Sequence, residues 1–165
     1  MQLQRSGGVF LRYIFILKLA KHIGNNVKID PGVIINNIEK LSIGDNVSIN
    51  PYCFLIASGG ITIGSNVSIA HHTSIISESH TWEDEDTPIS YNPIEPPPVT
   101  KDDDVWVGCG ARIIGTCHIQ SRTIIAAGAV VKGELESGCI YGGIPAKIMK
   151  RIANGKNQTR SMGPG

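Results

Sequence analysis

The 165-residue sequence predicts an all-β protein in which short parallel strands wind into a stacked triangular coil. Three observations predict this. A block with the pattern Ile-Gly-x-Asn-Val-x-Ile returns every 20 residues, at 23–29, 43–49 and 63–69. Within each block aliphatic residues recur every six residues, a period that fits neither an α-helix nor a simple amphipathic strand. The chain also contains 26 Ile and 10 Val against 7 Leu, which is the preference of strands rather than helices.

The six-residue period fits short strands separated by turns, with one inward aliphatic residue on each face of a triangle. Three strands close one coil, and stacked coils pair the backbone groups of each strand with those above and below. Gly, Asn and Asp directly after the inward aliphatic supply the backbone angles of the corners. After an interruption the rhythm resumes at Val107, Ile113, Ile119, Ile125 and Val131. Lys101 stands in the preceding slot, where the pattern calls for an apolar residue.

Both ends of the chain lie outside the repeat, which occupies residues 23–152. Residues 1–22 are expected to form a cap with an amphipathic helix over 9–20, because an open coil end exposes its core. Contact of this segment with a membrane surface is the less favoured alternative. At the other end we expect a short basic helix that begins at Lys147 and a flexible tail over 153–165.

Composition excludes several classes of protein. A net charge of +1 with 18% charged residues argues against a general nucleic-acid binder. The longest apolar stretch, residues 13–17, is far shorter than the roughly 20 residues that cross a bilayer. Arg12 interrupts any secretory pattern, and the four cysteines contain no C-x-x-C pair. We therefore expect reduced thiols and a cytoplasmic protein.

The interruption is a loop excursion over about residues 76–98, and long excursions from a repeat are often functional. His80 lies near its start, and an imidazole suits a general base near neutral pH. Trp82, Glu83 and Asp84 follow as candidate substrate-binding residues. The remaining histidines are interpreted as corner or surface residues: His22, His71, His72 and His118.

Over residues 23–152 the sequence resembles the hexapeptide-repeat acyltransferase family, whose fold is a left-handed parallel β-helix. It is most similar to sugar O-acetyltransferases of the galactoside/maltose and the capsule/lipopolysaccharide types. These carry a catalytic histidine at the start of such a loop and re-enter the helix through a segment like residues 98–108. Residues 141–150 match the Gly-x-Pro-Ala-Lys ending of the family. The resemblance implies that His80 is the catalytic base.

The same resemblance implies an acetyl-CoA donor, no metal, and a homotrimer with active sites between subunits. In that family small residues let the pantetheine arm lie against the backbone, a proline packs near the adenine, and basic residues approach the phosphates. The corresponding donor-binding residues of this chain are Trp106, Cys109, Gly110, Ala127, Gly128, Lys132, Pro145, Lys147 and Lys150. A nucleophilic Cys109 that forms an acyl-enzyme is a less favoured alternative.

The predicted function is transfer of an acetyl group from acetyl-CoA to a sugar or surface-polysaccharide hydroxyl. Alternatives within the fold are an N-acetyltransferase of an amino sugar or nucleotide sugar, and a streptogramin-type antibiotic acetyltransferase. A non-catalytic β-helix scaffold is the alternative outside enzymology. A γ-type carbonic anhydrase is disfavoured because the five histidines offer no His-x4-His pair.

Overall fold

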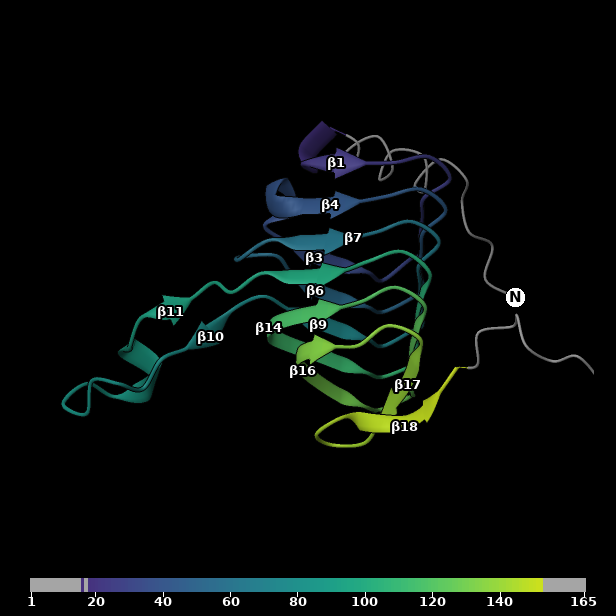
Figure 1. Ribbon diagram of the computed structural model, residues 1–165. Coiled ribbons are helices and arrows are strands. Elements are labelled where there is room, and N and C mark those ends of the chain that lie inside the picture. Colours follow the sequence, from purple (N-terminus) through teal and green to yellow (C-terminus); the bar gives the residue numbers. More distant parts are fainter. Residues whose placement is uncertain (1–15, 17, 153–165) are drawn as a thin grey trace, which may run out of the picture.

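The computed structural model describes Ile16 and residues 18–152 and has the predicted fold. Short strands wind into a solenoid of about six coils that matches a left-handed β-helix. Figure 1 shows the coils stacked from the purple to the yellow end, with one long arm that projects sideways from the middle of the stack.

The strands form three faces, which we name in chain order. The first face contains β1 (His22–Ile23), β4 (Leu41–Ile43), β7 (Ile61–Ile63), β12 (Val99–Lys101), residues 117–119 of β14 (Arg112–Ile119) and residues 133–135 of β16 (Val130–Leu135). The second face contains β2 (Lys28–Ile29), β5 (Ser48–Ile49), β8 (Ser68–Ile69), β13 (Val105–Val107), β15 (Thr123–Ile125), β17 (Cys139–Gly142) and β18 (Lys147–Arg151). The third face contains β3 (Ile34–Asn36), β6 (Phe54–Ile56), β9 (Ser74–Ile76), and the first residues of β14 and β16.

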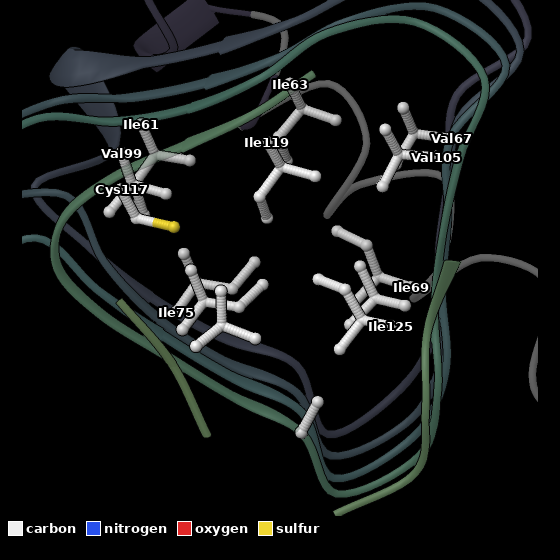
Figure 2. Packing of buried hydrophobic residues seen from close by; sticks show 14 of the residues in the cluster. Ile61, Ile63, Val67, Ile69, Ile75, Val99, Val105, Cys117, Ile119 and Ile125 are labelled. Carbon is white, nitrogen blue, oxygen red and sulfur yellow. The ribbon is translucent and has the colours of Figure 1, made fainter. Parts of the chain in front are cut away.

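Neighbouring coils are in strict register, as the 20-residue repeat predicts. Leu41 is paired with Ile61, and Ile49 with Ile69, in parallel ladders. The inward side chains of all three faces are almost completely buried and form one continuous core. Figure 2 shows these side chains converging from the three walls, with Ile61, Val99 and Cys117 stacked in one column.

Lys101 is the exception in this core. It lies in register between Ile63 and Ile119, and only 1% of it is exposed. Its Nζ has no hydrogen-bond partner within the part of the chain that the structure describes. Burial lowers the pKa of Lys101 to about 8 and raises the pKa of the nearby Cys117 thiol to about 11. A lysine therefore occupies an aliphatic slot with no group to bind its ammonium.

The three faces meet at three corners, where the chain turns through left-handed backbone angles. The first corner, between the first and second faces, carries an asparagine ladder. Asn26 donates to the side chain of Asn46 at 3.0 Å, and Asn46 donates to that of Asn66 at 3.2 Å. All three have positive φ, which Asn tolerates better than most residues. The predicted role of Asn at corners is confirmed.

The second and third corners carry the residues of functional interest. The second corner joins the second face to the third and contains, coil by coil, Gly32, Tyr52, His72, Gly110 and Gly128. The third corner joins the third face to the first, and η1 (Ile38–Lys40) lies there in the first coil. The arm leaves the third corner after β9 and returns at β12.

The arm is a folded projection rather than an open loop. Its base is an antiparallel pair of β10 (Ser79–His80) and β11 (Ile94–Glu95), and η2 (Ile89–Tyr91) lies near its tip. The buried Asn92 amide donates to the carbonyl of Thr87 at 2.9 Å and so ties the tip together. The returning strand crosses Gly59, where a side chain would collide with the backbone of Pro96.

The C-terminal prediction of a basic helix is wrong, because residues 147–151 form strand β18. It runs antiparallel to β17, with Ile140 opposite Lys150. In this position β18 covers the edge of the last coil, whose backbone groups a helix would have left unpaired.

The structure describes only part of the predicted N-terminal helix. Ile16, Lys18 and Leu19 are helical, whereas residues 1–15, 17 and the predicted tail 153–165 lie outside the described residues. No helix within the described part of the chain is long and apolar enough to span a bilayer.

Candidate active site

His80 lies where the arm leaves the third corner, opposite Ile94 in the β10–β11 pair. Beside it is a hollow of about 180 Å³, open to solvent. The hollow is lined by Ser79, His80, Thr81, Trp82, Glu83, Glu95, Pro97, Gly115, Thr116 and Lys132. Three predicted residues, His80, Trp82 and Glu83, therefore lie together. Trp82 is 68% exposed, so most of its ring is free to meet another molecule.

Lys132 lies in this hollow rather than beside the other two predicted phosphate-binding lysines. Ile113 is paired with Val131, so Lys132 follows Ile114 down the edge of the third face. Its Cε lies 3.6 Å from the position that a Cβ of Gly115 would occupy. Sequence reasoning missed Gly115 and Thr116, although the 18-residue spacing to Lys132 contained the register that brings them together.

Asp84 lies farther along the arm and is engaged in folding it. Its carboxylate accepts a hydrogen bond from the hydroxyl of Thr87 at 2.8 Å and another from the N–H of Asp86 at 3.1 Å. These bonds form a local turn near the tip of the arm. The carboxylate of Glu83, in contrast, belongs to a residue that lines the hollow.

The small residues predicted for the donor form an open strip along the second corner. Gly128 donates its N–H to the carbonyl of Cys109 at 2.9 Å, which holds these two coils in register. A Cβ added to Gly110 or Gly128 would meet nothing within 4 Å, whereas one added to Gly108 would collide with the backbone at Ala127. The strip therefore has room for a ligand outside the coil and none inside it.

Pro145, Lys147 and Lys150 follow at the C-terminal end of this strip. Pro145 lies in the exposed turn between β17 and β18, and Lys147 is opposite Gly142 in the last coil. Both lysine side chains are exposed. This part of the second corner thus combines an apolar turn with two free positive charges.

Trp106 lies on the second face and is 54% exposed. It borders a separate hollow of about 270 Å³ together with Ser68 and Asn66. An ion pair between Arg122 and Asp104, at 3.3 Å, closes one side of this hollow. In a single chain Trp106 therefore adjoins neither His80 nor the glycine strip.

The predicted residues consequently form two groups on opposite edges of the third face. The donor strip passes Gly110 at the second corner, and the His80 hollow includes Gly115 at the third corner. The five residue steps between these glycines follow an extended strand, which spans roughly 16 Å. An imidazole cannot cover that distance, so one chain does not bring its His80 to its own donor strip.

Other polar clusters in the described residues have simpler roles. Among them no three His, Cys, Asp or Glu side chains converge as a metal site would require. His118 lies on the first face, with Asp102 at 3.1 Å from Nε2 and Glu134 at 3.4 Å from Nδ1. All four cysteines are free thiols.

Comparisons with known proteins point to one group of enzymes. A hexapeptide-repeat acetyltransferase from Vibrio cholerae has a TM-score of 0.80 and 26% identity, over 91% of this chain and 84% of that one. A second structure of that enzyme contains acetyl-CoA. A maltose O-acetyltransferase from Clostridium difficile 630 has a TM-score of 0.79 at 21% identity, over 92% and 79% of the two chains, and so shares the fold.

The sequence relatives carry a different acceptor chemistry in their names. A 2,3,4,5-tetrahydropyridine-2,6-dicarboxylate N-acetyltransferase from Staphylococcus aureus is 38% identical over 63 residues. The match covers 36% of this chain and only 26% of that protein. No family model matches the chain.

Proposed function

Because the chain has hexapeptide-repeat acetyltransferases as structural neighbours and carries their left-handed β-helix, we propose that it transfers an acetyl group from acetyl-CoA to a sugar hydroxyl. The observation that carries this proposal is the pairing of an exposed histidine beside a hollow with an open glycine strip that ends in basic residues. The first group provides a base, and the second provides a track for a thin, anionic thioester carrier.

In the proposed reaction His80 accepts the proton of the attacking hydroxyl as its oxygen adds to the thioester carbonyl. The C–S bond then breaks, CoA leaves as a thiolate that takes up a proton, and the acetyl ester remains on the sugar. Positive charge from Lys132 and backbone N–H groups near Gly115 would stabilise the oxyanion. Acetyl-CoA is a substrate here, and no metal takes part.

The donor is proposed to lie along the second corner. Its pantetheine arm would run past Gly128 and Gly110, with the thioester near Cys109. The adenosine would meet Pro145, and its phosphates would meet Lys147 and Lys150. The fit is supported by the open space outside both glycines and by the exposure of both lysines.

A homotrimer would unite the two groups that one chain keeps apart. If three rods pack around an axis along their first corners, the first face of each copy borders the second face of the next. The second corner of one copy then lies beside the third corner of its neighbour, at the mouth of a cleft between them. Trp106, on the second face, would line the same cleft. We propose that each active site combines His80 of one subunit with the donor strip of another.

The arm supports this arrangement because it exposes large apolar side chains that one chain does not cover. They are Trp82, Ile89, Tyr91 and Ile94. Figure 1 shows the arm projecting well beyond the coils that carry it. Apolar groups on a projection are best explained by a neighbouring molecule that buries them.

The shared site predicts complementation between two inactive variants. His80→Ala removes the base, and Ala127→Trp fills the donor strip at an exposed position. Co-expressed in equal amounts, they should recover about a quarter of the wild-type rate, because that fraction of sites pairs two intact halves. Acetyl transfer by the mixed, size-fractionated oligomer measures this. A site contained within one chain would give a mixture as inactive as either variant alone.

Donor binding predicts a second outcome. The double variant Lys147→Ala/Lys150→Ala should raise the KM for acetyl-CoA about tenfold or more, because two charged contacts to phosphate are lost. The KM for acetyl-pantetheine, which lacks the nucleotide, should not change. Lys21→Ala, an exposed lysine of the first coil, is the matched control. Equal loss with both donors would place the phosphates elsewhere.

The acceptor is tested by thiol release from acetyl-CoA in the presence of sugars, oligosaccharides and amino sugars. Turnover with hydroxyl acceptors supports the proposal. The Staphylococcus aureus relative is an N-acetyltransferase, so exclusive turnover with an amine would support N-acetylation instead. Tight acetyl-CoA binding is expected in either case, and its absence would reject an acetyltransferase.

A further inference from the structure

Two aromatic rings stack on the surface at the second corner, directly beyond the proposed donor strip. The ring centroids of Tyr52 and His72 are 5.3 Å apart, and their planes differ by 12°. His71 meets His72 edge-on, with centroids 5.5 Å apart and planes at 77°. Tyr52 is 60% exposed, and both histidines are exposed. The sequence analysis treated these histidines as surface residues, and the proposed reaction does not use them.

The rings occupy positions where the backbone favours glycine. Five successive coils place Gly32, Tyr52, His72, Gly110 and Gly128 at this corner, all with φ between 59° and 79°. A bulky side chain in this left-handed region costs free energy that glycine avoids. The sequence uses glycine three times and aromatic residues twice. Strained residues of this kind gather at ligand sites, where the side chain has a use that outweighs the strain.

The stack is supported on one side and open on the other. Tyr52 packs against the backbone of Gly32, since a Cβ there would lie 2.6 Å from the tyrosine ring. Next to His72 in the column comes Gly110, where a Cβ would meet nothing within 4 Å. The Arg112 guanidinium donates to the carbonyls of both His72 and Gly110, at 2.8 and 2.7 Å, and holds these two corners together. A flat molecule therefore has a ring to stack on and space beside it.

We propose that the Tyr52–His72 stack is the acceptor platform, on which the sugar ring of the acceptor lies. This inference rests on the proposed function, which sets the direction of the donor. The nucleotide end of the donor lies near Lys147 and the thioester near Gly110, so the next coil beyond the thioester must receive the acceptor. His72 is on that coil, which is also the coil from which His80 departs.

The chemistry of the stack suits a pyranose. The C–H faces of a sugar ring pack on aromatic rings, while its hydroxyl groups need hydrogen bonds at the ring edges. The Tyr52 hydroxyl and the imidazoles of His71 and His72 supply those bonds. In the proposed trimer the partner subunit's His80 faces this corner at the same level, so a hydroxyl of the stacked ring would lie between base and thioester.

The test separates acceptor binding from donor binding. Saturation-transfer NMR would be run with maltose, glucosamine and the methyl glycosides of glucose, galactose and N-acetylglucosamine, and calorimetry with acetyl-CoA. The variants are Tyr52→Gly, His72→Gly and Tyr52→Phe. Asn26→Gly is the matched control, because it also places glycine at a left-handed corner but in the first coil.

We expect at least one sugar to bind the wild-type protein through its ring protons. Both glycine variants at the stack should weaken that sugar roughly tenfold or more, whereas Tyr52→Phe and Asn26→Gly should retain it. The melting temperature of the two stack variants should stay equal or rise, since strain is relieved. Affinity for acetyl-CoA should be unchanged in all of them.

Three results would overturn the platform: sugar binding that survives both glycine variants, binding of acetyl-CoA but of no sugar by the wild type, or loss of acetyl-CoA affinity in the stack variants. The last result would mean that the rings hold the donor. A wild-type protein that binds sugar on the stack but no acetyl-CoA would instead refute the proposed function and leave the platform standing.

Discussion

Replacing His80 with alanine is expected to lower the rate of acetyl transfer about 10²-fold or more and to leave acetyl-CoA binding intact. The physical reason is that a hydroxyl is a weak nucleophile until a base removes its proton. The structure puts His80 at the rim of an open hollow, and the donor strip lies on another edge of the rod. Loss of the imidazole should therefore affect kcat and spare the donor.

The measurement is single-turnover acetyl transfer together with calorimetric titration of acetyl-CoA. His22→Ala is the matched control, because His22 is an exposed histidine in the first coil, two coils from the arm. Transfer by His80→Ala at the wild-type rate would remove His80 from the mechanism. A parallel loss of donor affinity would assign the residue to binding instead.

Replacing Lys101 with methionine is expected to stabilise the fold by roughly 3 kcal/mol at neutral pH. Burial lowers the pKa of Lys101 from an ordinary 10.5 to about 8. Each unit of pKa shift corresponds to about 1.4 kcal/mol, so holding the charged form inside the rod costs roughly 3 kcal/mol. Methionine has a similar length and no ammonium, and it restores an apolar residue between Ile63 and Ile119.

The gain has a defined pH dependence. Between about pH 8 and 10.5 the unfolded chain keeps the Lys101 proton and the folded chain has lost it. The unfolded state binds more protons there, so the free energy of unfolding rises with pH across this window. Below pH 8 the whole penalty is present, and above 10.5 it is gone. The advantage of Lys101→Met should accordingly be constant below pH 8 and shrink toward pH 10.5.

Urea unfolding of both proteins at one fixed concentration, from pH 7 to 10.5, measures this difference, and all other titrating groups cancel in it. Lys21→Met, at an exposed position, should show neither the gain nor the slope. A Lys101→Met protein less stable than the wild type would mean that the ammonium has a partner, for example in the assembled oligomer.

Much of the fold could be predicted from the sequence because each coil repeats one local rule. An aliphatic residue that returns every six positions has one buried environment in a triangular rod, and Asn at the first corner tolerates the angle that the turn needs. The rule failed at Lys147, where a basic stretch was interpreted as a helix. Edge coverage of β17 decided that segment, and no local pattern reports an open sheet edge.

Less of the candidate site could be predicted. The positions of His80, Trp82 and Glu83 beside one another follow from the start of the arm. The company of Lys132 does not, because it depends on the register between coils 18 residues apart. Tyr52 and His72 stack although 20 residues separate them, and an exposed aromatic residue carries no signal of its partner one coil away.

By itself the sequence determined the coil, since which side chains face inward is a property of residue spacing along the chain. It also determined that an arm with a histidine interrupts the repeat after the third coil. Only the tertiary structure decided that this histidine and the donor residues lie at different corners, that Lys101 has no partner inside the rod, and that two rings meet at the second corner. The reason is that closing each coil into a triangle turns separations in sequence into positions on separate edges, and those distances exist only once the rod has formed.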